Sequence, residues 1–570
     1  MFSKLWEILQ APLQYSRAHQ VKLAFGVLIS ALVVLRIILI VYRLCFHPLS
    51  KYPGPKWWGA SDLFWLWRTN VRGTYTREAP ALQRKYGNIV RLGPDRLMVD
   101  GSIAWTQIFS LSVKFHRMDE FSKVPNQLFP GDYKTIVAAP KDEHRRMRRQ
   151  LNHAFSDAAL KEQEDIIGLY VGKLIDQLER MAEAGEAADI TTWLNYTTFD
   201  IIGDLTFAES FHNLEDSSFH PYMSGFFRAI RGFAYSRMIL AKPHLTPFFL
   251  VFVGWREIWT AISTMLENLK LGDAKVKARM AMGPEPKEGR RDFMTYMMRE
   301  TRDGQPGFSE HDIIKNSGLL IGAGSETTAS AVSGFFFFAG MSPEKLKPLV
   351  EEVRSTYKSE SEINLVNTQH LPYLRACIEE TLRVYPTVVE IPPRQSPGSM
   401  LEGNWVPRGT LLHVNQLATM RNPNSFVDPE NWCPERWLPK THPLYTPCFE
   451  ADNKAAFKPF SYGPRDCAGK NLAYSEMRLM ISKILYGLDF ELVPGQERWY
   501  ADKHVWSVWE NKPLNTSYLA DGVVCGSSGG EHDQLDRLNY DRPDYDSNHN
   551  ALRNQHPAAG QTFGEYVVGN

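Results

Sequence analysis

The sequence is poor in cysteine and has no surplus of charge of either sign. Its 570 residues include 6 cysteines, with no Cys-x-x-Cys pair and no histidine at zinc-ligand spacing from any of them. This excludes a disulfide-rich scaffold and argues against a structural zinc site. The 64 Lys and Arg residues balance 64 Asp and Glu residues. The basic surplus typical of nucleic-acid-binding proteins is therefore absent, and no nucleic-acid partner is expected.

Long apolar runs are also scarce, and the clearest one lies near the N-terminus. Residues 23–42 form an apolar stretch of 20 residues, long enough to cross a bilayer. Its single charge, Arg36, costs about 2.5–3.5 kcal/mol near a helix centre, whereas each large apolar residue returns roughly 0.3–0.6 kcal/mol. A cleaved signal peptide is the alternative, but the run starts late and Arg43 follows it. We predict that residues 1–46 are an N-terminal segment with one membrane anchor, its helix at about 23–42.

The composition changes on both sides of the central body. Residues 47–56 are rich in proline and cannot form a regular helix, so they are predicted to be a stiff hinge that holds the body off the membrane. Residues 526–570 are rich in Gly, Ser, Asn, Asp and Gln and are predicted to be a disordered tail. The body at 57–525 is predicted to be one domain, with an internal loop at 283–289.

The pattern of the body is mainly helical. Short extended segments are predicted near 88–100 and 391–415, so the fold class is mainly α with a small β region. Apolar residues recur at helical spacing in seven segments: 158–183, 195–211, 256–282, 312–340, 343–357, 371–385 and 469–487.

The most informative motif surrounds Cys467, in the segment 460–469. A thiolate is a strong metal ligand, and the N–H groups at the start of the helix near Gly469 favour its negative charge. Gly463 and Gly469 allow the backbone to approach a large flat group, and Arg465 offers a cation to a carboxylate. Haem meets these conditions, with its iron facing the sulfur and its propionates facing Arg465. The alternative for a lone cysteine is a buried structural residue in a turn.

Five positions of this segment match the pattern F-x-x-G-x-R-x-C-x-G, which a random chain of this length matches on the order of once in 10⁴. The segment resembles the cytochrome P-450 family of haem-thiolate monooxygenases, and the resemblance extends over roughly 46–520. It implies the cytochrome P-450 fold, with 57–525 as the catalytic domain. It also implies haem b with the Cys467 thiolate as axial iron ligand and these further haem contacts: Phe460, Gly463, Arg465 and Gly469.

A second matching motif is Glu380-Thr381-Leu382-Arg383. Charges three residues apart share one face of a helix, and a surface ion pair of that kind contributes almost nothing to stability. The resemblance implies a different arrangement, in which Arg436 of Pro434-Glu435-Arg436-Trp437 joins Glu380 and Arg383. The three would hold the segment that leads to the haem loop, in a structural role.

The segment Ala323–Thr328 matches the family's oxygen-activation motif. It lies in a helix predicted to start after Ser309, with Asp312 as its capping partner, and to run to about Gly340. Gly322 and Gly324 would weaken the helix and open a groove beside Glu326 and Thr327, which are predicted to be catalytic. An ordinary core helix is the alternative. A dinucleotide fingerprint is rejected, because Thr327 replaces its third glycine.

Three further residues are predicted to contact the haem propionates. His144 and Arg148 occupy the two defined positions of the family's W-x-x-x-R pattern, with His144 in place of Trp, and Arg394 follows two prolines. A solvated basic helix face is the alternative for the arginines around them. The aromatic-rich stretch 219–255 corresponds to the family's roof over the substrate pocket, which also dips into the membrane.

The resemblance implies insertion of one atom of O₂ into an apolar small molecule, with electrons from NADPH. An NADPH-cytochrome P-450 reductase would deliver them, and cytochrome b5 is a second candidate partner. The segment Phe199–Leu205 and the pattern of an anchor followed by a hinge look like those of fungal members of the family. The expected setting is therefore the endoplasmic reticulum membrane, a cytosolic catalytic domain and secondary-metabolite biosynthesis. Two alternatives stay open: a haem-thiolate enzyme that rearranges its substrate without O₂ or reductase, and a non-catalytic haem or apolar-ligand binding protein.

Overall fold

The computed structural model describes residues 17–110, 121–124, 135–283, 291–300, 307–506 and 508–520. The chain divides into two compact units, Met1–Ala520 and Asp521–Asn570. The second unit, and with it the predicted tail at 526–570, lies outside the described residues. So does the predicted loop at 283–289, apart from Gly283.

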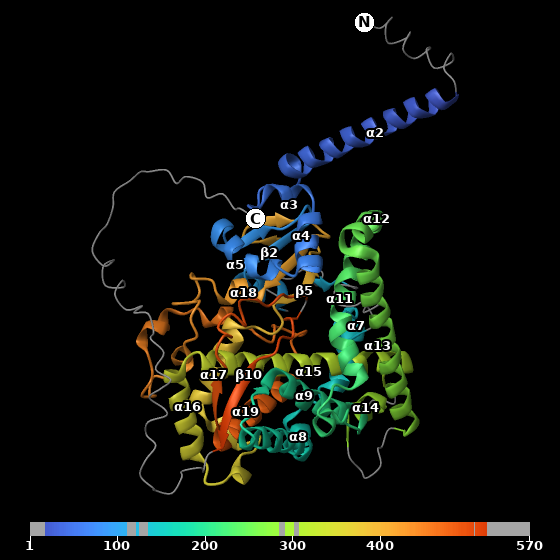
Figure 1. The fold of residues 1–570 in the computed structure, drawn as a ribbon. Coiled ribbons are helices and arrows are strands. Elements are labelled where there is room, and N and C mark those ends of the chain that lie inside the picture. Colours follow the sequence, from blue (N-terminus) through green and yellow to red (C-terminus); the bar gives the residue numbers. More distant parts are fainter. Residues whose placement is uncertain are drawn as a thin grey trace, which may run out of the picture. The chain divides into compact units, whose positions relative to one another are not determined.

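Helices make up most of the described part of the first unit (Figure 1). The seven helices predicted from apolar spacing are all present, as α8, α9, α13, α15, α16, α17 and α19. The mainly α fold class is therefore confirmed. The described α-helices are α2 (Arg17–Val41), α3 (Lys56–Ala60), α4 (Leu63–Trp67), α5 (Tyr75–Tyr86), α6 (Gly101–Ala104), α7 (Lys141–Leu151), α8 (Asp157–Glu183), α9 (Ile190–Phe207), α10 (Asn213–Asp216), α11 (Pro221–Ala241), α12 (Thr246–Phe249), α13 (Trp255–Ala281), α14 (Phe293–Met298), α15 (Glu310–Gly340), α16 (Pro343–Thr356), α17 (Pro372–Val384), α18 (Gln416–Met420) and α19 (Lys470–Gly487).

The long helix α15 forms the centre of the helical part (Figure 1). It begins after Ser309, whose hydroxyl accepts from the Asp312 N–H while Asp312 accepts from the Ser309 N–H, so the predicted capping pair is present. Helices α9, α13, α16, α17 and α19 pack against it. Most side chains between Ser325 and Ala339 are buried, because neighbouring helices cover this half of α15 on several sides.

The small β region lies where the extended segments were predicted. The largest described sheet has the order β1-β2-β8-β5-β3, with β2 and β8 parallel and the other pairs antiparallel. Strand β5 has an irregularity between Ile391 and Arg394, where Pro392 and Pro393 cannot donate to the ladder. The strands are β1 (Ile89–Arg91), β2 (Arg96–Val99), β3 (Ser122–Lys123), β4 (Ala188–Asp189), β5 (Glu390–Gln395), β6 (Ser399–Leu401), β7 (Asn404–Val406), β8 (Leu411–Asn415), β9 (Leu488–Leu492) and β10 (Asn515–Ala520).

The N-terminal apolar segment is helical. Two helical stretches are long and apolar enough to cross a membrane, Gln20–Phe46 and Pro243–Ala281. The first has none of its most apolar window buried against protein, so it is a candidate membrane anchor. The second packs against α11 and α15 through α13 and belongs to the folded body.

The predicted hinge at 47–56 differs from expectation. It is not a regular helix until α3 begins at Lys56, as its prolines require. It is not a free spacer, however, because Leu49 and Tyr52 are buried in the core of the five-stranded sheet. The Arg91 N–H also donates to the Pro53 carbonyl at 2.7 Å. Apolar side chains between the prolines therefore draw the segment onto β1.

Candidate active site

A cavity of about 290 Å³ lies between α15 and the loop that holds Cys467. Helix α15 contributes Ala323, Gly324 and Thr327 to its wall, and α7 and β5 contribute further residues. Leucine, isoleucine and proline side chains form much of the rest. The three motifs predicted from separate parts of the sequence therefore meet at one mainly apolar cavity.

Cys467 stands at the end of a tight loop before α19. Its N–H donates to the Phe460 carbonyl at 3.0 Å, which closes the loop. Gly463 has a φ of +82°, and a Cβ there would lie 2.2 Å from the Phe109 carbonyl oxygen. The close approach that requires this glycine is thus to the protein's own backbone. Gly469 does line the cavity, and a Cβ there would have Phe155 as its nearest contact, at 3.7 Å.

The Cys467 side chain is exposed to the space that the cavity provides. Its position deep within the protein raises the pKa of the Cys467 thiol, and the Gly469 N–H is the largest opposing influence. The helix start thus favours the thiolate as predicted, but burial has the larger effect. A metal ion that binds this sulfur must therefore displace its proton.

Basic side chains line the cavity from α7 and from the Cys467 loop. His144 and Arg148 line it from α7, one turn apart, and Arg465 lines it from the Cys467 loop. Burial lowers the pKa of His144 to about 3, and the charges of Arg465, Lys123, Arg148 and Arg394 add to this effect. His144 is therefore a neutral imidazole in a field of positive charge.

Protein contacts hold these cations in place. Arg148 pairs with Asp466 at 2.9 Å, and Arg465 donates to the Ala139 carbonyl at 2.8 Å. Arg394 is 3% exposed and lies over the Phe109 ring, 4.7 Å from its centroid. It belongs to β5 and lies behind the cavity wall instead of in it.

The residues around the cavity fit haem. Cys467 would supply the iron ligand, the basic side chains His144, Arg148 and Arg465 would contact the two propionates, and the apolar wall would pack against the ring. Gly469 leaves this part of the cavity wall open, because an added Cβ would have only Phe155 within 4 Å. Among the described residues, no group of three or more His, Cys, Asp or Glu side chains could hold a metal ion, so the candidate protein ligand for iron is the single Cys467 sulfur.

The predicted opening in the long helix does not occur. Helix α15 runs unbroken through Gly322 and Gly324. A Cβ at Gly322 would lie 2.7 Å from the Phe226 ring, and one at Gly324 would lie 2.6 Å from the Ile202 side chain. These glycines are therefore needed because the Phe226 ring of α11 and the Ile202 side chain of α9 pack directly against the helix. The Thr327 hydroxyl donates to the Ala323 carbonyl at 2.7 Å, within the helix.

Glu326 points away from the cavity wall into the protein. It is 3% exposed, and its Oε2 has no hydrogen-bond partner among the described residues. Burial raises the pKa of Glu326 to about 8, while the charge of Lys503 opposes the rise. A buried carboxyl of this kind holds its proton at neutral pH.

Residues near Glu326 form a polar chain that the motifs did not reveal. Lys503 is 3% exposed, its Nζ donates to the Tyr385 hydroxyl at 3.1 Å, and it lies 3.5 Å from the centroid of the Trp499 ring. The Tyr385 hydroxyl is 3.2 Å from Ser330 Oγ, one turn after Glu326 on α15. Burial lowers the pKa of Lys503 to about 7, and Glu326 is the main opposing charge. These residues come from three distant segments, so no local pattern marks them.

The structure brings Glu380, Arg383 and Arg436 together in a fully buried cluster. Arg383 donates to both Glu380 carboxylate oxygens at 2.8 and 2.9 Å, and Arg436 Nε donates to Oε1 at 3.1 Å. The side chains of all three are 0% exposed. The Cys433 N–H and the Trp437 indole also donate to Glu380, at 2.7 and 2.9 Å.

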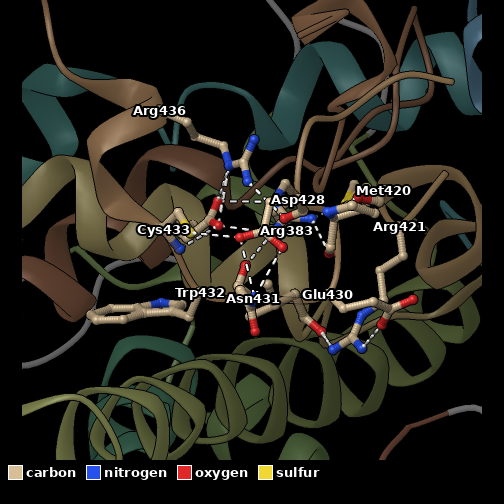
Figure 2. Close-up of polar contacts among 12 residues, drawn as sticks. Arg383, Met420, Arg421, Asp428, Glu430, Asn431, Trp432, Cys433 and Arg436 are labelled. Carbon is tan, nitrogen blue, oxygen red and sulfur yellow. Dashed lines mark hydrogen bonds and ion pairs between the residues drawn. The ribbon is translucent and has the colours of Figure 1, made fainter. Parts of the chain in front are cut away.

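The two arginines bind the backbone of the segment 420–431 (Figure 2). Arg383 donates to the carbonyls of Met420, Pro429 and Asn431, and Arg436 donates to those of Val427 and Asp428. Arg436 also pairs with Asp452 at 2.6 Å. The cluster therefore holds the irregular chain between α18 and the Cys467 loop, away from the cavity.

Known proteins match nearly the whole body of the chain. The family model described as Cytochrome P450 matches residues 53–517. Cytochrome P450 monooxygenase aclL of Aspergillus oryzae is 35% identical over 491 residues, which cover 85% of this chain and 96% of that protein. The trichothecene C-15 hydroxylase of Fusarium sporotrichioides is 35% identical over 510 residues, 88% of this chain and 98% of that protein. The trichothecene C-4 hydroxylase of Trichoderma arundinaceum is 34% identical over 488 residues, 83% and 93% of the two chains. Together with the Cys467 motif at the cavity, these matches show that the chain belongs to the cytochrome P450 family.

Proposed function

We propose that the chain is a haem-thiolate monooxygenase that inserts one oxygen atom from O₂ into an apolar substrate. The observation that carries this proposal is the meeting of Cys467, the cation group and Thr327 at one apolar cavity. Cys467 would be the axial iron ligand, and His144, Arg148, Arg394 and Arg465 would hold or orient the propionates. Bound haem would supply the activation of dioxygen, and the thiolate ligand favours cleavage of the O–O bond.

The residues of α15 would handle protons in this reaction. The Thr327 hydroxyl lies at the cavity wall and donates its proton to the Ala323 carbonyl, so its oxygen would accept a hydrogen bond from one water in the cavity and hold that water in place. Glu326 holds a proton at neutral pH because it is buried. Its pKa of about 8 is close to neutral pH, so it can also donate that proton during the reaction. Lys503, with a pKa of about 7, would restore that proton through the polar groups around Tyr385.

The remaining parts of the proposal concern partners and setting. Electrons from NADPH would come through a membrane-bound reductase, with cytochrome b5 as a second donor. The candidate anchor at Gln20–Phe46 supports a single-pass protein on the endoplasmic reticulum, with its body in the cytosol. Relatives named as trichothecene hydroxylases support a role in fungal secondary-metabolite biosynthesis.

One experiment separates this function from the two alternatives. Purified protein is combined with a fungal reductase, NADPH and O₂, and substrate-dependent NADPH consumption is measured with and without each component. A monooxygenase requires all of them. A rearranging enzyme converts its substrate without reductase, and a binding protein stimulates no NADPH consumption, so either result would contradict the proposal.

A further inference from the structure

Two acidic side chains among the described residues line the cavity at Cys467, those of Asp466 and Glu476. Asp466 pairs with Arg148, and that contact explains its place. Glu476 belongs to α19, the helix that begins directly after the Cys467 loop, and is 2% exposed. Within the described part of the chain no cation pairs with Glu476. Its position in the wall therefore needs another explanation.

A hydroxyl group of α15 holds the Glu476 carboxyl group. Thr328 is 3% exposed, lines the same cavity, and donates a hydrogen bond from its hydroxyl to Glu476. Hydroxyl side chains within a helix often donate to the carbonyl four residues earlier. Those of Ser325, Thr327 and Ser333 do so, at 2.7, 2.7 and 2.8 Å. Thr328 differs from these neighbours, because its hydroxyl joins α15 to α19.

The carboxyl group of Glu476 is mainly neutral in this contact. Burial raises the pKa of Glu476 to about 8, and the hydrogen bond from Thr328 opposes the rise. At neutral pH the carboxyl group is therefore mostly protonated, with an oxygen that accepts from Thr328 and an O–H that can donate. A side-chain amide has the same capacity to accept and to donate. Glutamine can therefore replace a protonated Glu476 and keep its hydrogen bond.

The contact between Glu476 and Thr328 connects the helix after Cys467 to the helix that carries Thr327. Glu476 lies in the second turn of α19, and Thr328 directly follows Thr327 on α15. The two helices also pack against each other. A shift of α15 along α19 would move the Thr327 hydroxyl relative to the Cys467 sulfur, and a buried hydrogen bond between them resists that shift. Displacements of about 1 Å in an orienting group can change a rate by large factors.

We propose that Glu476 is a positioning residue, which acts through Thr328 to hold the Thr327 hydroxyl at a fixed place relative to Cys467. The inference rests on the proposed function, in which the Thr327 oxygen holds a water in the cavity. Ordinary packing between two core helices is the alternative role for the pair, and it predicts a change in stability alone. Positioning predicts that variants which keep the hydrogen bond resemble the wild type, while variants which lose it let that water move.

The test compares two kinds of variant in the full-length holoprotein. Glu476→Gln and Thr328→Ser keep the hydrogen bond, whereas Glu476→Leu and Thr328→Val lose it. The first readout is the infrared stretching band of carbon monoxide bound to the reduced protein, because a water beside the ligand shifts this band. The second is the rate at which O₂ re-oxidises the reduced protein.

We expect Glu476→Leu and Thr328→Val to shift the band and to speed re-oxidation by at least about twofold. Glu476→Gln and Thr328→Ser should leave both readouts as in the wild type. If Glu476→Leu does not retain haem, Thr328→Val gives the same test, because it removes the other partner of the bond.

The matched control is Ser333→Ala, because Ser333 is a fully buried hydroxyl residue of α15 that does not line the cavity. It should alter neither readout. In a Thr327→Ala background, Glu476→Leu should cause no further change, since Glu476 acts through Thr327. Wild-type readouts in Glu476→Leu, or equal changes in Glu476→Gln and Glu476→Leu, would overturn the inference. The proposed function would survive either result, because it depends on the separate absorption spectrum that reports the Cys467 ligand.

Discussion

Replacing Glu380 with glutamine should destabilise the fold without touching the cavity. The change keeps the size of the side chain but removes the charge that faces Arg383 and Arg436, all three of them fully buried. Breaking a buried ion pair by removing one partner costs about 3–5 kcal/mol, since the remaining charges are left uncompensated. Total stability is about 5–15 kcal/mol, so the loss is a large part of it.

Glu430→Gln is the matched control. Glu430 also pairs with two arginines, Arg84 at 3.0 Å and Arg421 at 2.6 Å, and Figure 2 shows it near the buried cluster. Its side chain is 51% exposed, so its ion pairs should contribute no more than about 1 kcal/mol. The free energy of unfolding is measured for both variants by urea titration, followed by circular dichroism. Equal losses in the two variants would refute the assignment of the large effect to burial.

The stability lost in the Glu380→Gln variant should depend on pH. Burial disfavours ionisation of Glu380, but Arg383, Arg436 and the Cys433 N–H together hold the pKa of its carboxyl below the ordinary value of 4.5. Its contribution to stability is therefore complete above pH 4.5 and is lost as the pH falls through its lower pKa in the folded state. The difference in free energy of unfolding between wild type and Glu380→Gln should narrow as the pH is lowered below about 4.5. A difference that stays constant would contradict this reasoning.

Three further changes test other parts of the account. Thr327→Ala should leave haem content and stability nearly unchanged while the ratio of product to NADPH consumed falls and hydrogen peroxide rises; an unchanged ratio would exclude Thr327 from proton handling. Lys503→Met should also lower that ratio. The same substitution should raise the free energy of unfolding more at about pH 6 than at pH 10. The Lys503 pKa of about 7 lies below the 10.5 of a free lysine, so the wild type buries a charged amine at pH 6 and a neutral one at pH 10. An effect that does not depend on pH would argue against a buried cation at this position. Removal of residues 1–46 should release the body from membranes washed with carbonate, whereas full-length protein that washes off would show that Gln20–Phe46 does not span the bilayer.

The sequence patterns predicted the long helices well, because each has an apolar face of its own. Both ends of α13 and α19 were predicted to within one residue. Helix α11 (Pro221–Ala241) was not predicted as a helix, because its many aromatic residues were interpreted as a pocket roof without a helical period. The segment at 47–56 was predicted to be free, because proline content is visible in a sequence and burial of Leu49 against a distant sheet is not.

The candidate site could be predicted only where a motif is local. Cys467, Arg465 and Thr327 lie in short motifs, and the structure places all three at the cavity. The need for glycine at position 463 was wrongly attributed to the approach of a ligand, since the group that excludes a side chain there is the Phe109 carbonyl. The burial of Lys503 and the contact between Glu476 and Thr328 depend on segments far apart in the chain, so only the folded structure reveals them.

The most direct test of the central claim is the carbon monoxide difference spectrum of the reduced protein. With Cys467 as the thiolate ligand of haem iron, the wild type should show the red-shifted Soret band of the family, and Cys467→Ala should lack it. Cys433→Ala and Cys448→Ala, which change cysteines that do not line the cavity, should retain the band. A red-shifted band that persists in Cys467→Ala, or that disappears only when one of the other two cysteines is replaced, would contradict the assignment.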